Sequence, residues 1–158
     1  MKPIIFLLCG LPGSGKTTYA KELSEKEHLV RLTLDEELFK RFGKEFPSDK
    51  YSEYEIQTKQ ELLVILEQKI KQNESVILDY GFWKKEDRNR YKQLIENYGA
   101  EYKLIYLKQN HEVLIDRINK RNEFNSTDNH IISEELLEKF KSQFEEPKNE
   151  NEIIINII

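Results

Sequence analysis

The sequence has little of what membrane-spanning and disulfide-linked proteins require. It contains one cysteine, Cys9, and its longest uninterrupted apolar run is the six residues Ile4–Cys9. A membrane-spanning helix needs about 20 apolar residues in succession, so no segment of this chain is expected to cross a membrane. One cysteine cannot form a disulfide within the chain, which is typical of proteins of the reducing cytoplasm. We therefore expect a cytoplasmic protein with no membrane contact.

The chain has the length and the apolar content for one highly charged domain. Its 158 residues are 38% hydrophobic and 34% charged, against about 25% charged in an average protein. The apolar residues are gathered in runs that can pack, which favours a folded chain over a disordered one. The net charge of −4 gives no overall attraction to nucleic acid, so a nucleic-acid partner is disfavoured. We expect residues 1–158 to form a single domain.

Apolar runs that are typical of buried strands alternate along the chain with segments of helical periodicity. The expected strands are Ile4–Cys9, 30–34, 76–78 ending at Asp79, 104–107 and 153–158. The expected helices are 16–27, a short one after Asp35, 52–72 opening on a capping box, 85–98, 111–121 and 133–144. The middle of the helix over 52–72, Leu62–Leu66, is apolar all round and is expected to be buried on more than one side. This alternation predicts a three-layer α/β domain with a mostly parallel sheet.

The segment GLPGSGKT, residues 10–17, matches the phosphate-binding pattern G-x-x-x-x-G-K-[ST] and lies between an expected strand and an expected helix. Glycines let such a loop wrap with its N–H groups around an anion, and the following helix adds the positive end of its dipole. Lys16 is expected to contact the β and γ phosphates of ATP, and the Thr17 hydroxyl is expected to ligate Mg²⁺. The predicted nucleotide-binding residues are Gly10, Pro12, Gly13, Ser14, Gly15, Lys16, Thr17 and Thr18.

Two aspartates follow expected strands and extend the predicted site. Mg²⁺ in phosphate-loop proteins takes a further contact from an Asp at the end of a neighbouring apolar strand, and Asp79 fits this description. Asp35 follows another strand, at the carboxyl edge of the sheet where ligands of open α/β folds bind. It is predicted to be the general base that accepts the proton of an attacking hydroxyl. The residues alone equally allow Asp35 to be the N-cap of the helix that begins there.

Two arginines precede a polar, unpatterned stretch of the chain. Arg117 and Arg121 are four residues apart, on one face of the expected helix 111–121. Arginines on a closing segment can stabilise the charge on a transferring phosphoryl group, so Arg117 and Arg121 are candidate nucleotide ligands, and at least one of them is predicted to act on the nucleotide. The alternative is a solvated helix end, where cations suit the helix dipole. We expect a lid over about 117–132.

The residues after Asp79 allow two interpretations. Arg88 and Arg90 are candidates either for contact with a substrate phosphate or for surface ion pairs with nearby carboxylates. Aromatic residues gather on both sides of the predicted site and line either an acceptor cavity or the core. They are Tyr80, Phe82 and Trp83 after Asp79, and Phe39, Phe42, Phe46, Tyr51 and Tyr54 after Asp35.

Four segments together, GLPGSGKTTYA, LTLDEELF, VILDYGFW and LIDRINKRN, resemble the AAA-domain group of small P-loop kinases. The group includes the kinase domain of polynucleotide 5′-kinases, chloramphenicol phosphotransferase and, more distantly, the zeta-toxin kinases. The resemblance covers nearly the whole chain and implies a P-loop NTPase fold with about five parallel strands in the order 2-3-1-4-5. It also implies Asp35 as the general base, Asp79 as the strand-end Asp and Arg121 as the lid arginine on the donor phosphates.

One position departs from the pattern of the polynucleotide kinases in this group. They have an arginine one helical turn after the catalytic Asp, where it holds an acceptor phosphate, and here that position is Leu38. We therefore expect an ATP-dependent kinase that phosphorylates a hydroxyl of a small-molecule acceptor. The alternatives that stay open are a polynucleotide 5′-hydroxyl kinase and a nucleotide-binding ATPase switch without a phosphoryl acceptor.

Overall fold

The computed structural model describes residues 1–43, 45–124 and 133–156, without the side chains of Ser48, Arg121 and Phe124. In this part of the chain, five parallel strands form one sheet in the order β2-β3-β1-β4-β5. The strands are β1 (Ile4–Cys9), β2 (Val30–Thr33), β3 (Val76–Gly81), β4 (Glu101–Lys108) and β5 (Ile153–Asn156). The α/β class, the parallel pairing and the strand order expected from the sequence are confirmed.

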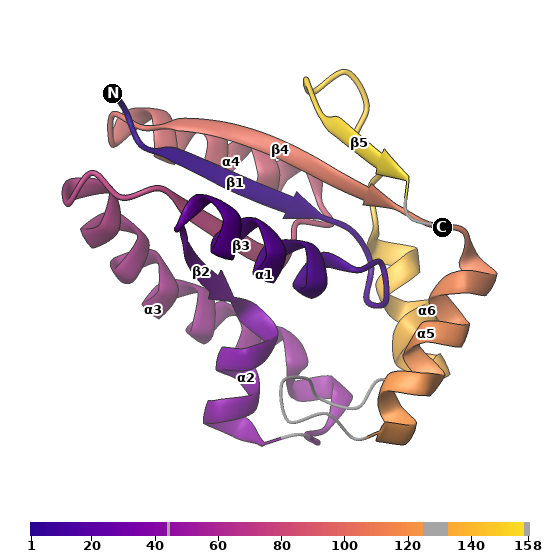
Figure 1. The fold of residues 1–158 in the computed structure, drawn as a ribbon. Coiled ribbons are helices and arrows are strands. Elements are labelled where there is room, and N and C mark those ends of the chain that lie inside the picture. Colours follow the sequence, from indigo (N-terminus) through magenta and orange to yellow (C-terminus); the bar gives the residue numbers. More distant parts are fainter. Residues whose placement is uncertain (44, 125–132, 157–158) are drawn as a thin grey trace.

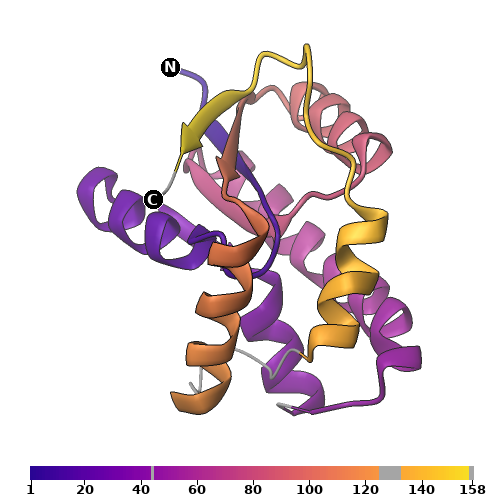
Figure 2. The same cartoon turned by 90° about the vertical axis from the view of Figure 1, so that its right-hand side faces the viewer.

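Helices cover both faces of the sheet, as Figures 1 and 2 show. They are α1 (Lys16–Glu27), α2 (Leu34–Phe42), α3 (Tyr51–Lys71), α4 (Lys85–Asn97), α5 (His111–Phe124) and α6 (Glu134–Gln143). Helix α1 lies on one face, where its Ala20 packs among buried residues of β1, β3 and β4. Helices α3, α4 and α6 lie on the other face and bury residues such as Leu66, Ile95 and Phe140 against the strands. The sheet is therefore the middle layer of three.

The strand ends bring the predicted site residues to one edge of the sheet. All six residues of β3 are buried, as expected for a central strand covered on both faces. Thr33 at the end of β2 pairs with Asp79 of β3, so Asp35, two residues further on, lies at the same edge. The loop over residues 10–15 begins where the neighbouring strand β1 ends. This is the carboxyl edge, where ligands of open α/β sheets bind.

Some element boundaries and burial patterns differ from the sequence expectations. Leu34 opens α2 instead of ending β2. Helix α3 begins at Tyr51, directly after the single 3-10 turn Ser48–Lys50, so Ser52 lies inside the helix and the predicted capping box does not form. Leu62 and Leu66 are buried, but the predicted burial of this stretch on more than one side is wrong, because Val64 is 55% exposed. Leu62 and Leu66 are four residues apart and share one face of the helix, whereas Val64, two residues from each, points to the opposite side.

None of the helices in the described ranges is long and apolar enough to cross a membrane.

Candidate functional site

The loop between β1 and α1 has the backbone of an anion-binding nest. Gly13 and Gly15 have φ angles of +82° and +94°, in the left-handed region that favours glycine. The Ser14 N–H donates to the Leu11 carbonyl at 3.1 Å, which closes the turn, and the Gly10 N–H donates to the Gly81 carbonyl of β3 at 3.0 Å. Helix α1 begins directly after Gly15, so the positive end of its dipole faces the loop. The loop can therefore surround a phosphate group.

We expect a methyl group at Gly13 to damage this loop. A Cβ there would lie 3.0 Å from the Leu114 carbonyl and 3.1 Å from Ile118 Cγ1, in addition to the backbone strain at positive φ. The Gly13→Ala variant is expected to bind ATP at least about tenfold more weakly, as measured by titration calorimetry. Gly99→Ala is the matched control, because Gly99 has the same φ of +82° and an added Cβ meets no atom within 4 Å among the described residues. Equal ATP affinity in wild type and Gly13→Ala would contradict the predicted role of the loop.

Three side chains converge just beyond this loop. The Thr17 hydroxyl donates to Asp79 Oδ2 at 3.0 Å, and the Lys16 ammonium donates to the Leu11 carbonyl at 3.1 Å. Asp79 is almost completely buried, and this burial raises the pKa of its carboxyl above the usual range. The Asp35 carboxylate adds to the rise, whereas Lys16 and the Thr17 hydrogen bond oppose it. A hydroxyl beside a buried carboxylate is a hard oxygen donor set of the kind that Mg²⁺ takes next to nucleotide phosphates.

The raised pKa of Asp79 makes its ionised form a cost to folding. The folded protein holds the proton on Asp79 more tightly than the unfolded chain, so the cost is fully present above the raised pKa, shrinks as the pH falls through it and is gone below the ordinary pKa of an aspartate. Asp79→Asn is therefore expected to unfold at an equal or higher urea concentration at pH 7, and this difference should shrink in acid. Urea unfolding across a pH series measures the effect. A clear loss of stability at pH 7 would mean that the ionised carboxylate stabilises the fold.

Asp35 lies across a narrow cavity from the loop. The cavity is lined by Pro12, Lys16, Asp35 and Asp79, among other residues. The N-cap interpretation of Asp35 is wrong, because the N-cap of α2 is Thr33 and Asp35 is in the first helical turn. The Asp35 carboxylate is thus available to the cavity, where it faces a lysine and a second carboxylate.

The connection between β4 and α5 contacts the loop through a residue that the motif did not indicate. With its amide oriented to match its neighbours, Gln109 donates to the Gly13 carbonyl at 2.8 Å and accepts from Arg117 Nη1 at 3.1 Å. Arg117 is therefore linked to the loop through Gln109. The side chain of Arg121 and residues 125–132 of the expected lid lie outside the described residues. Thr18 is exposed in the first turn of α1.

Known proteins are similar to this chain over most of its length. Residues 5–147 match the protein family described as AAA domain. The chain belongs to this family. Membership makes it a P-loop, nucleotide-binding, kinase-like protein, and it confirms the resemblance noted in the sequence.

Solved structures share the fold of this AAA domain at low sequence identity. A candidate kinase from Chloroflexus aurantiacus superposes with a TM-score of 0.80 at 19% identity, over 99% of this chain and 89% of that one. A gluconokinase from Sinorhizobium meliloti superposes with a TM-score of 0.62 at 17% identity, over 98% of this chain and 82% of that one. A chain of the Pnkp1/Rnl/Hen1 RNA repair complex superposes with a TM-score of 0.68 at 24% identity, over 90% of this chain and 44% of that one.

A second, larger cavity of the AAA domain adjoins the narrow one. It has a volume of about 670 Å³, within the range of small-molecule sites. The two cavities share the wall residues Tyr51, Tyr80, Trp83 and Phe140. Trp83 and Phe140 lie with their ring centroids 4.5 Å apart.

The two aromatic clusters noted in the sequence have different positions in the structure. From the first, Tyr80, Phe82 and Trp83 all line the large cavity. From the second, Tyr51 lines it, whereas Phe42 stacks on Tyr54 with ring centroids 3.7 Å apart. Both interpretations that the sequence allowed, cavity wall and core packing, therefore apply to different residues.

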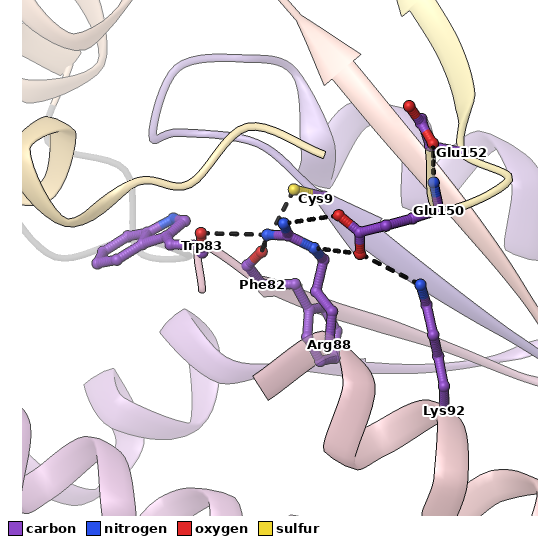
Figure 3. Close-up of polar contacts among 7 residues, drawn as sticks. All are labelled: Cys9, Phe82, Trp83, Arg88, Lys92, Glu150 and Glu152. Atoms are coloured by element: carbon purple, nitrogen blue, oxygen red, sulfur yellow. Dashed lines mark hydrogen bonds and ion pairs between the residues drawn. The ribbon is translucent and has the colours of Figure 1, made fainter. Parts of the chain in front are cut away.

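A buried ion-pair cluster contacts the backbone of Phe82 and Trp83, two residues that line the large cavity (Figure 3). Arg88 of α4 is 1% exposed and donates to both carboxylate oxygens of Glu150, at 3.0 and 2.9 Å. It also donates to the carbonyls of Phe82 and Trp83, at 2.8 and 3.1 Å. Lys92 donates to the same carboxylate at 3.2 Å. The interpretation of Arg88 as a substrate-phosphate ligand or surface residue is thus wrong, whereas Arg90 does pair with Asp87 at the surface, at 3.3 Å.

This cluster reaches the phosphate loop through one further bond. The Trp83 indole N–H donates to the Gly10 carbonyl at 3.2 Å, so Arg88 holds the backbone of a residue that itself contacts the loop. Burial opposes ionisation of Glu150, but the hydrogen bonds from Arg88 and Lys92 outweigh it and hold its pKa below the usual range. The neighbouring Cys9 is buried, which raises the pKa of its thiol to about 12 and leaves it protonated and unreactive at neutral pH.

Proposed function

We propose that this protein is an ATP-dependent phosphotransferase that moves the γ-phosphoryl group of Mg-ATP to a hydroxyl of a small-molecule acceptor. One observation carries the proposal: Lys16, Asp35 and Asp79 line one narrow cavity, and a larger cavity shares its walls. A donor phosphate on the loop and an acceptor in the larger cavity would meet beside Asp35. Such positioning is the main source of rate in phosphoryl transfer.

The proposed reaction forms one bond and breaks one. The acceptor oxygen bonds to the γ-phosphorus, the bond from that phosphorus to the β,γ-bridging oxygen breaks, and ADP leaves with the electron pair. Asp35 accepts the proton of the acceptor hydroxyl as the new bond forms. Lys16 stabilises the charge on the phosphoryl oxygens, and Arg117 and Arg121 are proposed to add to this from α5.

The residues present suit the nucleotide and the metal that the family implies. The loop is packed so closely at Gly10 that only glycine fits: a Cβ there would come within 2.6 Å of Ser14 Oγ and 3.1 Å of the Leu107 carbonyl. Thr17 and Asp79 would hold Mg²⁺, Asp79 directly or through water. When bound, Mg²⁺ neutralises charge on the β- and γ-phosphate oxygens.

A small molecule is the acceptor that the residues favour. Leu38 stands where polynucleotide kinases of the group have a phosphate-binding arginine, and its side chain is fully buried in the core. The larger cavity has the volume of a small-molecule site, with aromatic walls that suit a ring or an apolar face.

The test is transfer of label from γ-labelled ATP in the presence of Mg²⁺ to a panel of acceptors. The panel contains sugars, nucleosides, aminoglycosides, phenicols and 5′-hydroxyl oligonucleotides, and Lys16→Ala serves as the blank. We expect label on one class of small molecule and none in the blank. Label on the oligonucleotides would identify a polynucleotide kinase instead. Label released only as free phosphate, whatever the acceptor, would favour an ATPase switch.

A further inference from the structure

The charged groups around the large cavity are unequal in number. Four cations and two carboxylates line it: Lys59, Lys84, Arg90, Lys139, Glu55 and Asp87. The cavity therefore carries an excess of positive charge in a chain whose net charge is −4. Such a local reversal of sign concentrates anions at the cavity.

Two of these four cations pair with a carboxylate of the cavity, and in the described part of the chain the other two do not. Lys59 pairs with Glu55 at 2.9 Å, and Arg90 pairs with Asp87 at 3.3 Å. Lys84 and Lys139 have no acidic partner among the residues that the structure describes. Both lysines line the same cavity as the Trp83–Phe140 ring pair.

We infer that the large cavity binds an acceptor that combines an aromatic or flat apolar ring with an anionic group, a carboxylate or a phosphate. The ring packs against Trp83 and Phe140, and the anion is held by Lys84 and Lys139. Because these two rings also wall the narrow cavity, a hydroxyl on such an acceptor lies within reach of Asp35. This inference rests on the proposed function only where it calls the bound molecule an acceptor. The binding itself can be tested without any catalysis.

Trp83 provides the readout, because it is the single tryptophan of the chain and it lines the cavity. Its fluorescence reports occupation of the cavity without any catalysis. The probes are 4-(hydroxymethyl)benzoate and the uncharged 4-(hydroxymethyl)benzamide, which share the ring and the hydroxyl and differ in charge. Two further probes, 4-(hydroxymethyl)phenyl phosphate and gluconate, test a phosphate as the anion and an anion without a ring.

We expect the benzoate to bind about fivefold more tightly than the benzamide at low salt, and added salt should reduce this preference. The double variant Lys84→Gln/Lys139→Gln is expected to abolish the preference while leaving benzamide binding unchanged. Lys85→Gln is the matched control, because Lys85 is an exposed neighbour that does not line the cavity. The phosphate probe binds more tightly than the benzoate if a phosphate is the natural anion, and less tightly if it is a carboxylate.

Equal binding of the benzoate and the benzamide would overturn the inference, as would a preference that survives in the double variant. Gluconate that binds as tightly as the benzoate would overturn the part that assigns a ring. Failure of every probe to change Trp83 fluorescence, in a protein that binds ATP, would also overturn it. The proposed function fails separately, by the absence of label transfer to any acceptor, so the two failures are told apart.

Discussion

Replacing Asp35 by asparagine is expected to lower the rate of phosphoryl transfer by about 10²–10⁴-fold, the usual contribution of a general base. The amide keeps the size of the side chain but cannot accept the proton of the acceptor hydroxyl. Asp35 lines the narrow cavity but is not part of the phosphate loop, so the dissociation constant for ATP should change by no more than about twofold. Steady-state kinetics with the acceptor found in the panel, together with titration calorimetry for ATP, measure the two effects.

Glu36→Gln is the matched control for this variant. Glu36 is the next residue in α2, is bonded to Arg31 at 2.9 Å and does not line the narrow cavity. It should retain both ATP binding and transfer. Full transfer in Asp35→Asn would remove Asp35 from the mechanism, and a parallel loss of ATP binding would make it part of the nucleotide site instead.

The second large effect is expected at Arg88 and concerns stability. Arg88→Met leaves the Glu150 carboxylate buried without its bidentate partner, and breaking a buried pair in this way costs about 3–5 kcal/mol. Arg90→Met removes the exposed pair with Asp87 and should cost less than about 1 kcal/mol. Urea unfolding of the two variants measures the difference.

A third variant separates loss of the pair from loss of packing. In Arg88→Met/Glu150→Gln the unpaired charge is gone, so part of the stability lost in Arg88→Met should return. The account holds that the buried cluster fixes the segment around Glu150 against α4. It would be contradicted if Arg88→Met lowered the free energy of unfolding by no more than Arg90→Met. If the double variant and Arg88→Met had the same free energy of unfolding, the loss of stability would come from lost packing alone.

The phosphate loop and the sheet could be predicted because local sequence determines them. The spacing of Gly10, Gly15 and Lys16 requires a strand before the loop and a helix after it, and both are present. The fully apolar run Ile4–Cys9 is typical of a central parallel strand, and alternation of strand and helix limits the possible orders of the sheet. The position of Asp79 followed from the same rule, because strand ends in a parallel sheet meet at one edge.

Contacts between distant segments could not be predicted in this way. Arg88 and Glu150 are 62 residues apart, and nothing in the local pattern of either indicates the other. Gln109 lies in a connection between β4 and α5, where a single glutamine carries no signal of its contact with Gly13. The large cavity is formed by α3, α4, α6 and the end of β3, so its charge excess depends on packing that one sequence does not reveal.

The central claim is that the γ-phosphoryl group leaves ATP for an acceptor hydroxyl and not for water. The most direct measurement follows ATP, ADP, free phosphate and phosphorylated acceptor together by ³¹P nuclear magnetic resonance, with and without the acceptor found in the panel. The account predicts that the acceptor accelerates ADP formation and that each ADP is matched by one phosphorylated acceptor. Formation of ADP and free phosphate in equal amounts, at a rate that the acceptor does not change, would contradict it.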